Sequence, residues 1–218
     1  MEKELYHVFS RGVEKRNIIQ NDKDRLRFVH DLWAFNSTGL TPNYILPERH
    51  KTENPKHIPL VHIHAWCLMS NHYHLLLSPA LEGGISRFIQ KLNMGYTKYF
   101  NEKHKRSGVL WQGKHKKILI ERDAHFLYIP YYIHLNPLDM TKPEWREGSV
   151  KNIEAALEDL RAYRWSSHLD YSGVRNFPSL ITTSLLKEML GKPPAYEKQI
   201  RDILSDESLA APSMFLEN

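Results

Sequence analysis

The fold of this chain is best indicated by residues 67–77, which read CLMSNHYHLLL. Ser70 and Asn71 are polar turn-forming residues between two apolar runs, 58–69 and 72–77, so the sequence predicts an antiparallel hairpin with a tight turn. Because side chains alternate between the two faces of a strand, His72 and His74 share one face, with Cα atoms ~7 Å apart. The hairpin therefore places two imidazoles side by side on a rigid element.

The residues around the hairpin predict an α+β domain. The expected elements, in chain order, are a strand at 5–9, a helix from Asp22 or Asp24, the hairpin, an amphipathic helix at 85–103, a strand at 117–121 and a helix from Asp123 to Leu135 that Pro137 ends. This order predicts a small antiparallel sheet with helices packed on one face, the plan of ferredoxin-like and RNA-recognition-type domains.

Two segments depart from this compact plan. Residues 37–59 contain five Pro and Gly residues and few apolar ones, which predicts a long surface insertion. Residues 141–218 follow the last helix of the domain and are expected to form a mostly helical C-terminal extension, with helices at 150–163, 183–190 and 195–204. The predicted organisation is thus a domain at 1–140, which includes the insertion, and an extension at 141–218.

Composition narrows the class of protein. The 218 residues are 41% hydrophobic and 25% charged, which is typical of a globular protein with a real core. We find no apolar run of the ~18 residues that a membrane span needs. The N-terminus lacks the order of a signal peptide, and the single cysteine, Cys67, excludes an intrachain disulfide and a zinc-thiolate cluster. A cytoplasmic protein without membrane contact is expected.

Positive charge is concentrated in one segment. The net charge of +5 favours a polyanionic partner only weakly, but residues 103–117 contain six Lys and Arg residues and no acid. Such a block is often just a solvated face. Here Trp111 and two glycines are interleaved with the basic residues, which favours a loop that faces nucleic acid.

A second chemical motif lies in the helix expected at 123–135. Residues four apart share a helix face, so Tyr132 lies beside Asn136. An amide oxygen together with two imidazoles suits Mg²⁺ or Mn²⁺ and leaves room for phosphate oxygens. The alternative is that Tyr131 and Tyr132 merely pack on the sheet while Asn136 helps to end the helix. A similar ambiguity applies to His62 and His64, which we expect to fill the strand face or to orient the other histidine pair.

Taken together, these motifs resemble the single-tyrosine HUH transposases, and specifically the REP-associated tyrosine transposase branch. The resemblance covers roughly residues 5–173, and its blocks follow the family's order. They are Tyr6-His7-Val8 with Arg11-Gly12, residues 67–76, Gly108 with residues 110–114, Tyr132 to Pro137, and Trp165-Ser166-Ser167.

The resemblance implies an activity and a set of site residues. The catalytic nucleophile falls on Tyr132, and the metal ligands fall on His72, His74 and Asn136, with Mg²⁺ or Mn²⁺ as the cofactor. Members of the family are metal-dependent endonucleases and strand transferases that act in DNA transposition and recombination. They cleave single-stranded DNA next to a hairpin through a 5′-phosphotyrosine intermediate. The expected partner is therefore single-stranded or hairpin DNA, bound by a monomer or a homodimer.

For DNA binding, the sequence favours a set of basic and aromatic residues near these motifs. Lys and Arg side chains would contact phosphates, and Trp111 could stack on an unpaired base or, alternatively, pack as a loop aromatic on the core. The predicted DNA-binding residues are Arg11, Arg16, Trp111, Lys114 and Lys116.

Some features depart from the family, and other functions compete. The insertion at 37–59 is longer than the usual connection, and Pro130 should kink or restart the helix two residues before Tyr132.

A domesticated DNA- or RNA-binding protein would keep the fold without cleavage. A relaxase or replication initiator would share the histidine pair, but relaxases commonly carry the tyrosine near the N-terminus, and Tyr6 lies within an expected strand. A non-catalytic structural domain with an incidental histidine pair is the last alternative.

Overall fold

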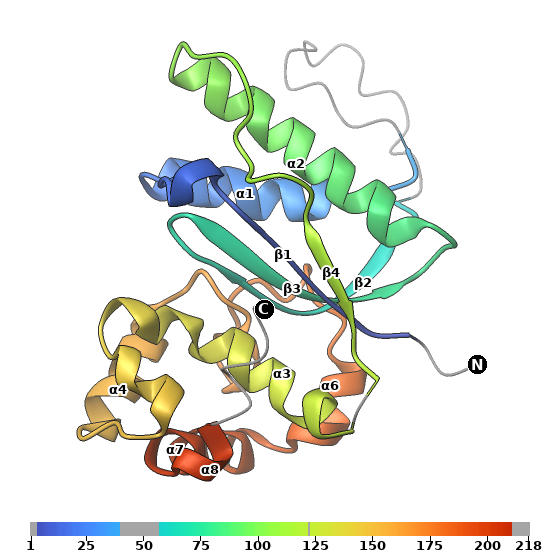
Figure 1. The fold of residues 1–218 in the computed structure, drawn as a ribbon. Coiled ribbons are helices and arrows are strands. Elements are labelled where there is room, and N and C mark those ends of the chain that lie inside the picture. Colours follow the sequence, from blue (N-terminus) through green and yellow to red (C-terminus); the bar gives the residue numbers. More distant parts are fainter. Residues whose placement is uncertain (1–3, 40–56, 122, 211–218) are drawn as a thin grey trace.

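The structure, a computed structural model, describes residues 4–39, 57–121 and 123–210, with only the backbone of 123–125 (Figure 1). Most of the predicted insertion, residues 40–56, lies outside the described residues. The elements are β1 (Tyr6–Arg11), η1 (Val13–Lys15), α1 (Asp22–Ala34), β2 (Val61–Leu68), β3 (His72–Pro79), α2 (Gly84–Lys103), β4 (Lys116–Leu119), α3 (Asp123–Leu135), η3 (Asn136–Met140), η4 (Pro143–Glu147), α4 (Ile153–Ala162), α5 (His168–Tyr171), α6 (Ser184–Leu190), α7 (Pro193–Ser205) and α8 (Glu207–Ala210).

The described residues form one four-stranded antiparallel sheet with the strand order β2-β3-β1-β4. This is the order expected when two β-α-β units of a ferredoxin-like domain interleave, and the predicted α+β class is confirmed. The predicted hairpin is β2 and β3, whose turn contains Ser70 and Asn71. Its strand β3 lies inside the sheet, paired on both edges, so the two histidines stand on a rigid strand.

Helices cover both faces of the sheet. The sequence predicted helices on one face only, and the structure corrects this prediction: α1 and α2 pack on one face, and α3 with the C-terminal helices covers the other (Figure 1). The alternation of side chains along each strand divides the core accordingly. Val8, Tyr73 and Leu75 belong to the cluster under α1 and α2, whereas Cys67 and Leu76 belong to the cluster under α3.

Local sequence features explain where the helices begin and end. The side chain of Asn21 caps α1, because its Oδ1 accepts a hydrogen bond from the backbone N–H of Asp24 at 3.2 Å. The sequence predicted a kink or restart of α3 at Pro130, but α3 continues without a restart to Leu135, where the tighter turn η3 follows. Proline removes one hydrogen bond of the helix, and the buried packing of α3 against the sheet offsets that loss.

The C-terminal region shares its core with the sheet. The Tyr171 hydroxyl donates to the backbone oxygen of His64 at 2.7 Å, and the backbone N–H of Trp66 donates to Ser167 Oγ at 2.9 Å. Apolar residues of α4, α6 and α7 lie in the same buried cluster as α3 and the sheet. In the part of the chain that the structure describes, no helix has the length and apolar character needed to cross a membrane.

Candidate functional site

The face of the sheet under α3 carries the predicted histidines. Phe9 pairs with His74, and Arg11 pairs with His72, across the β1–β3 ladder, so these four side chains lie on one face. His7 precedes Phe9 by two residues on β1 and lies on the same face. The rings of His72 and His74 are 5.0 Å apart between centroids and nearly perpendicular.

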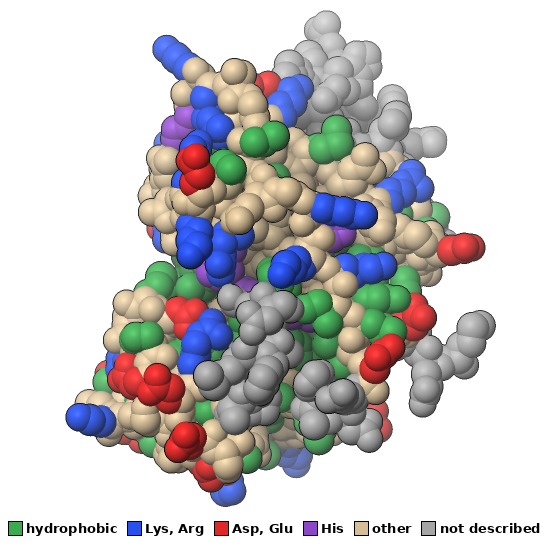
Figure 2. Space-filling model, viewed as in Figure 1, with side chains coloured by type: hydrophobic (Ala, Val, Ile, Leu, Met, Phe, Trp, Pro, Cys, Tyr) green, Lys and Arg blue, Asp and Glu red, His purple; other side chains and the backbone are tan. Residues whose placement is uncertain are grey.

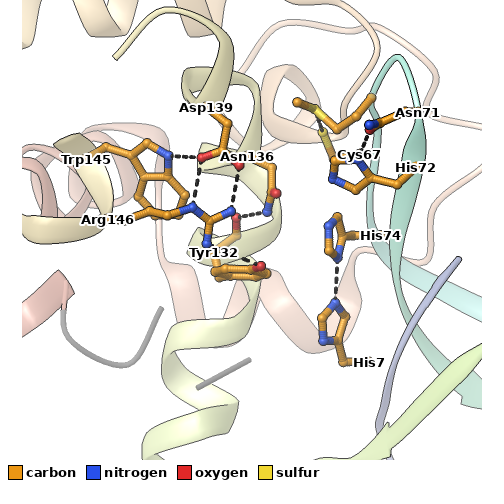
Figure 3. A network of polar contacts seen from close by, with 11 residues as sticks. His7, Cys67, Asn71, His72, His74, Tyr132, Asn136, Asp139, Trp145 and Arg146 are labelled. Atoms are coloured by element: carbon orange, nitrogen blue, oxygen red, sulfur yellow. Dashed lines mark hydrogen bonds and ion pairs between the residues drawn. The ribbon is translucent and has the colours of Figure 1, made fainter. Parts of the chain in front are cut away.

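The helix α3 brings Tyr132 to these histidines. Its ring centroid lies 5.6 Å from that of His74 and 5.9 Å from that of His7. Figure 3 shows the hydroxyl end of Tyr132 directed toward the column of histidines, with Asn136 one turn farther along the chain. The structure therefore brings together the four side chains for which the sequence predicted a catalytic or metal-binding role, three of them fully buried and His72 nearly so.

The hydrogen bonds of the two rings involve the same nitrogen of each imidazole. His72 Nδ1 lies 2.5 Å from Asn71 Oδ1, and His74 Nδ1 lies 2.9 Å from His7 Nε2. In both rings Nε2 is consequently the nitrogen that could bind a metal. Burial, with the nearby charges of His72, His7 and Arg146, holds the pKa of His74 well below its usual range. His74 is therefore neutral at pH 7, as a metal ligand must be.

The amide of Asn136 is fixed in orientation. Its Nδ2 donates to the backbone oxygen of Tyr132 at 2.7 Å. Its Oδ1 is buried and has no hydrogen-bond partner within the described residues. Because an unsatisfied buried oxygen is costly, such an atom suggests a ligand that the protein alone does not supply.

The residues present fit a hard divalent cation with few protein ligands. Among the described residues, no group of three or more His, Cys, Asp or Glu side chains could hold a metal ion. The predicted set instead combines two imidazoles with the orphaned oxygen of Asn136. Such a set leaves coordination positions for water and phosphate oxygens, as Mg²⁺ sites usually do.

A cation that the sequence analysis missed lies against Tyr132. Arg146 Nη1 is 3.5 Å from the Tyr132 oxygen, and its guanidinium carbon lies 5.2 Å from the centre of the Tyr132 ring. Asp139 holds this guanidinium through two hydrogen bonds, from Nε at 2.9 Å and from Nη2 at 2.6 Å. Trp145 Nε1 donates to the same carboxylate at 2.7 Å (Figure 3). The arginine is thus held with one N–H group toward the phenol.

The surroundings of Arg146 favour its charged, protonated form. Burial favours its neutral form, but the hydrogen bonds to Asp139 and the interaction with Tyr132 outweigh burial and raise the pKa of the guanidinium above its usual value. The residue comes from η4, in the region that the sequence assigned to the C-terminal extension. Lys117, the last residue of the basic segment 103–117, lies on the opposite face of the sheet, over the ring of Tyr6.

The basic residues predicted to bind DNA fall in different places. Lys116 pairs with Phe9 and Arg11 with His72, so both point to the face that carries the histidines, at its edge. Lys114 is exposed in the loop before β4, and Arg16 is exposed and paired with Glu14 at 3.0 Å. In Figure 2, Lys and Arg side chains gather across the middle of the molecule, over β1 and β4, and acids gather over the helices below.

Trp111 lies in the core rather than on this surface. The residue is 8% exposed, its Nε1 donates to the backbone oxygen of Asn93 at 3.1 Å, and its ring packs edge-on against Tyr73. The structure thus supports the alternative considered from the sequence, a loop aromatic packed on the core.

The other histidine pair has a different environment. His64 lies at the bulge where the β2–β3 register shifts, and its Nε2 is 2.8 Å from the hydroxyl of Ser78. Its Nδ1 lies 3.2 Å from the backbone oxygen of Thr182. Ser78 is four residues from His74 along β3, or ~13 Å. His64 thus has its polar partners at the far end of the hairpin, which favours the interpretation that it fills the strand face.

No role was predicted from the sequence for Arg146, and none for His7 although His7 belongs to one of the motif blocks. A signal existed for His7, because the alternation of β1 places it on the same face as Phe9, and His is an unusual residue for a buried central strand. For Arg146 we find no local signal, since its contact with Tyr132 depends on how η3 and η4 fold back on α3.

The part of the chain that contains the site matches a known protein family. Residues 53–136 match the model of a family described as "Transposase IS200 like", a segment that contains His72, His74, Tyr132 and Asn136. The matched family is the kind of transposase that the sequence motifs resemble, and the match covers less than half of the chain.

The other comparisons are less informative. No curated protein matches the chain. A solved structure of a REP-associated tyrosine transposase bound to a REP hairpin is similar with a TM-score of 0.48 and 11% sequence identity. The similarity covers 85% of this chain and 88% of that chain.

Proposed function

We propose that this protein is a metal-dependent transposase that nicks and rejoins single-stranded DNA next to a hairpin. The observation that carries the proposal is the meeting of Tyr132 with the histidine pair, at 5.6 Å between the rings of Tyr132 and His74. The family match over residues 53–136 supports a DNA-processing role for the same residues. The metal is inferred from the donor atoms of the site, and the nicking chemistry and the hairpin are inferred from the resemblance to REP-associated tyrosine transposases.

Tyr132 is the nucleophile in this proposal. Its phenolic oxygen attacks the phosphorus of the scissile phosphodiester and loses its proton, a new P–O bond to tyrosine forms, and the bond from phosphorus to the 3′-oxygen breaks. The 3′-oxygen leaves and takes up a proton. The products are a 5′-phosphotyrosine and a free 3′-hydroxyl, so a later attack by a 3′-hydroxyl rejoins DNA without an external energy source.

The charge of the phenol and the phosphate has to be balanced in a buried site. When bound by His72, His74 and Asn136, a Mg²⁺ or Mn²⁺ ion would polarise a non-bridging oxygen of the phosphate. Free tyrosine has a pKa of about 10, so formation of the phenolate needs positive charge close to its oxygen. Arg146 supplies such a charge at 3.5 Å, and Asp139 keeps the guanidinium in place.

DNA would approach along the edge of the sheet where basic side chains face the site. Arg11 and Lys116 flank the histidine face, and contacts from them to phosphates would guide the strand toward His72. Tyr132 is fully buried, so the scissile phosphate reaches it only when α3 and β3 separate locally.

The proposal is tested by trapping the covalent intermediate. Wild-type protein is incubated with Mn²⁺ and a library of hairpin-bearing single strands labelled at the 3′ end, and an SDS-stable labelled adduct is sought. The label must be at the 3′ end because the fragment joined to tyrosine carries the 5′-phosphate.

The matched variants are Tyr132→Phe and Tyr131→Phe. Tyr131 is the neighbouring tyrosine of α3, and it stacks on Tyr196 at 5.6 Å between ring centroids. We expect no adduct from Tyr132→Phe and a wild-type adduct from Tyr131→Phe. Specific hairpin binding with no adduct from the wild type would instead support a DNA-binding protein without cleavage.

A further inference from the structure

We propose that His7 is a positioning residue that holds His74 in the tautomer able to bind a metal. The inference rests on the proposed metal site and assigns a role to a residue outside it. His7 would accept a hydrogen bond from His74 Nδ1–H, so that the lone pair of His74 lies on Nε2, the nitrogen nearer the site.

The geometry of the pair is that of a direct imidazole–imidazole hydrogen bond. His7 Nε2 and His74 Nδ1 are 2.9 Å apart, and the two ring planes differ by 17°. Both residues are fully buried, and they come from adjacent central strands whose register places them on one face (Figure 3). The contact is therefore fixed by the sheet rather than by flexible side chains.

At this distance one nitrogen has to carry the proton and the other the lone pair. If His74 Nδ1 carries the proton, Nε2 has the lone pair and can bind a metal. If His7 Nε2 carries it, the neutral His74 holds its own proton on Nε2 and cannot be a ligand. Binding of a cation by His74 thus depends on which partner donates.

The hydrogen-bond partner of His72, Asn71, fixes the same tautomer in that ring, with the proton on Nδ1 and the lone pair on Nε2. Asn71 Nδ2 donates to the backbone oxygen of Lys15 at 3.0 Å, so Asn71 Oδ1 faces His72 and acts only as an acceptor. This fixes the proton of His72 on Nδ1 and the lone pair on Nε2. His74 needs the same tautomer to bind the same ion, and its partner is a ring that can donate or accept. The position of the proton in the His7–His74 hydrogen bond therefore determines whether His72 and His74 both have a lone pair on Nε2.

The first test measures the tautomer directly in wild-type protein without metal. Two-bond ¹H–¹⁵N correlation spectra at pH 7 distinguish protonated from unprotonated ring nitrogens, with His74 assigned by its loss in His74→Gln. We expect a protonated Nδ1 and an unprotonated Nε2 for His74. A proton on His74 Nε2 would overturn the proposal, and this readout does not depend on metal binding or on activity.

The second test measures Mn²⁺ affinity from the electron paramagnetic resonance signal of the free ion. His7→Phe keeps a ring but offers no acceptor, and we expect it to weaken Mn²⁺ binding about 10–100-fold, as loss of a residue that orients a ligand typically does. His7→Gln can accept through its amide oxygen and should recover most of the affinity. Wild-type affinity in His7→Phe would contradict the proposal.

The control is His64→Phe, since His64 is also a buried histidine of the sheet with a polar partner, Ser78. It should lower stability and leave Mn²⁺ affinity unchanged. If wild-type protein binds no Mn²⁺, the metal site of the proposed function fails, and the tautomer spectrum still decides whether His7 positions His74.

Discussion

The β2–β3 hairpin carries two histidine pairs with the same spacing and different surroundings. His62 and His64 lie near the open end of the hairpin, where His64 contacts the hydroxyl of Ser78. His72 and His74 lie next to the turn, where they face the ring of Tyr132. In the first pair, both ring nitrogens of His64 have hydrogen-bond partners within the protein. The second pair lies beside an amide oxygen, on Asn136, that no described residue satisfies.

The comparison indicates that the chemical role of an i, i+2 histidine pair depends on the side chains of the element that packs over it. The two pairs lie on the same face of the sheet, one on β2 and the other on β3. Tyr132 of α3 and Asn136 at the start of η3 lie over the end near the turn, whereas His64 at the other end contacts the backbone oxygen of Thr182. Substitutions that treat the two pairs alike therefore test this interpretation most directly.

The largest effect is expected from the same substitution in each pair. His74→Ala should reduce formation of the covalent DNA adduct by at least about 100-fold, equivalent to about 3 kcal/mol of transition-state free energy, because a proposed metal ligand is lost. His64→Ala should leave the adduct rate unchanged and lower the free energy of unfolding by about 1–3 kcal/mol, because Ser78 loses a buried partner. Adduct assays and urea unfolding measure the two effects. Equal adduct rates in the two variants would remove the distinction between the pairs.

The cation beside Tyr132 is expected to have the next largest effect. Arg146→Gln should slow adduct formation about 10–100-fold, since it removes the charge next to the phenol. Arg146→Lys should recover part of the rate, because lysine keeps the charge but cannot form the two-point contact with Asp139.

The control for Arg146 is Arg161→Gln, an exposed arginine of the same region that pairs with Glu197 at 3.0 Å. Single-turnover adduct formation measures the rate in each case. A rate in Arg146→Gln equal to that of Arg161→Gln would show that the guanidinium does not act on the phenol.

His168 is a buried histidine of the C-terminal region, outside the candidate site, so its titration tests the effect of burial alone on stability. Burial lowers the pKa of His168 to about 4, and its Nδ1 lies 2.9 Å from the hydroxyl of Tyr196. In the unfolded chain the pKa is about 6.5, so the unfolded state takes up the proton first as the pH falls. The His168 contribution to stability is complete above about pH 6.5 and declines to about pH 4, a loss of up to about 3 kcal/mol.

Urea unfolding of wild type and His168→Phe between pH 7.5 and 4.5 measures this contribution. The variant should show a shallower decline of the free energy of unfolding with acid than the wild type. Parallel curves for the two proteins would contradict a neutral buried His168.

The smallest effect is expected from neighbouring lysines on opposite faces of β4. Lys116 pairs with Phe9 on the histidine face, and Lys117 lies over Tyr6 on the other. Lys116→Ala should weaken single-stranded DNA binding a few-fold and reduce the slope of log affinity against log salt by about 0.7. Lys117→Ala should change neither, as fluorescence anisotropy at several salt concentrations can measure. Equal losses in both variants would show that DNA does not favour the histidine face.

Much of the fold could be predicted because its signals are local. The polar turn at Ser70 and Asn71 between apolar runs predicted β2 and β3, and helical spacing predicted α2 almost to its bounds. The helix continued through Pro130, because packing against the sheet decides whether a helix tolerates proline. The cover on the second face was not predicted, since no local pattern states which face a C-terminal helix will choose.

The amino-acid sequence by itself determined the order of the elements and the facing of each residue along its own strand or helix. It therefore paired His72 with His74 and Tyr132 with Asn136, because periodicities of 2.0 and 3.6 residues are properties of the local backbone. Only the tertiary structure decided that these pairs meet, that His7 lies at 2.9 Å from His74, and that Arg146 lies at 3.5 Å from the Tyr132 oxygen. Such contacts join residues far apart in the chain, and they follow from the packing of whole layers, which no short stretch of sequence specifies.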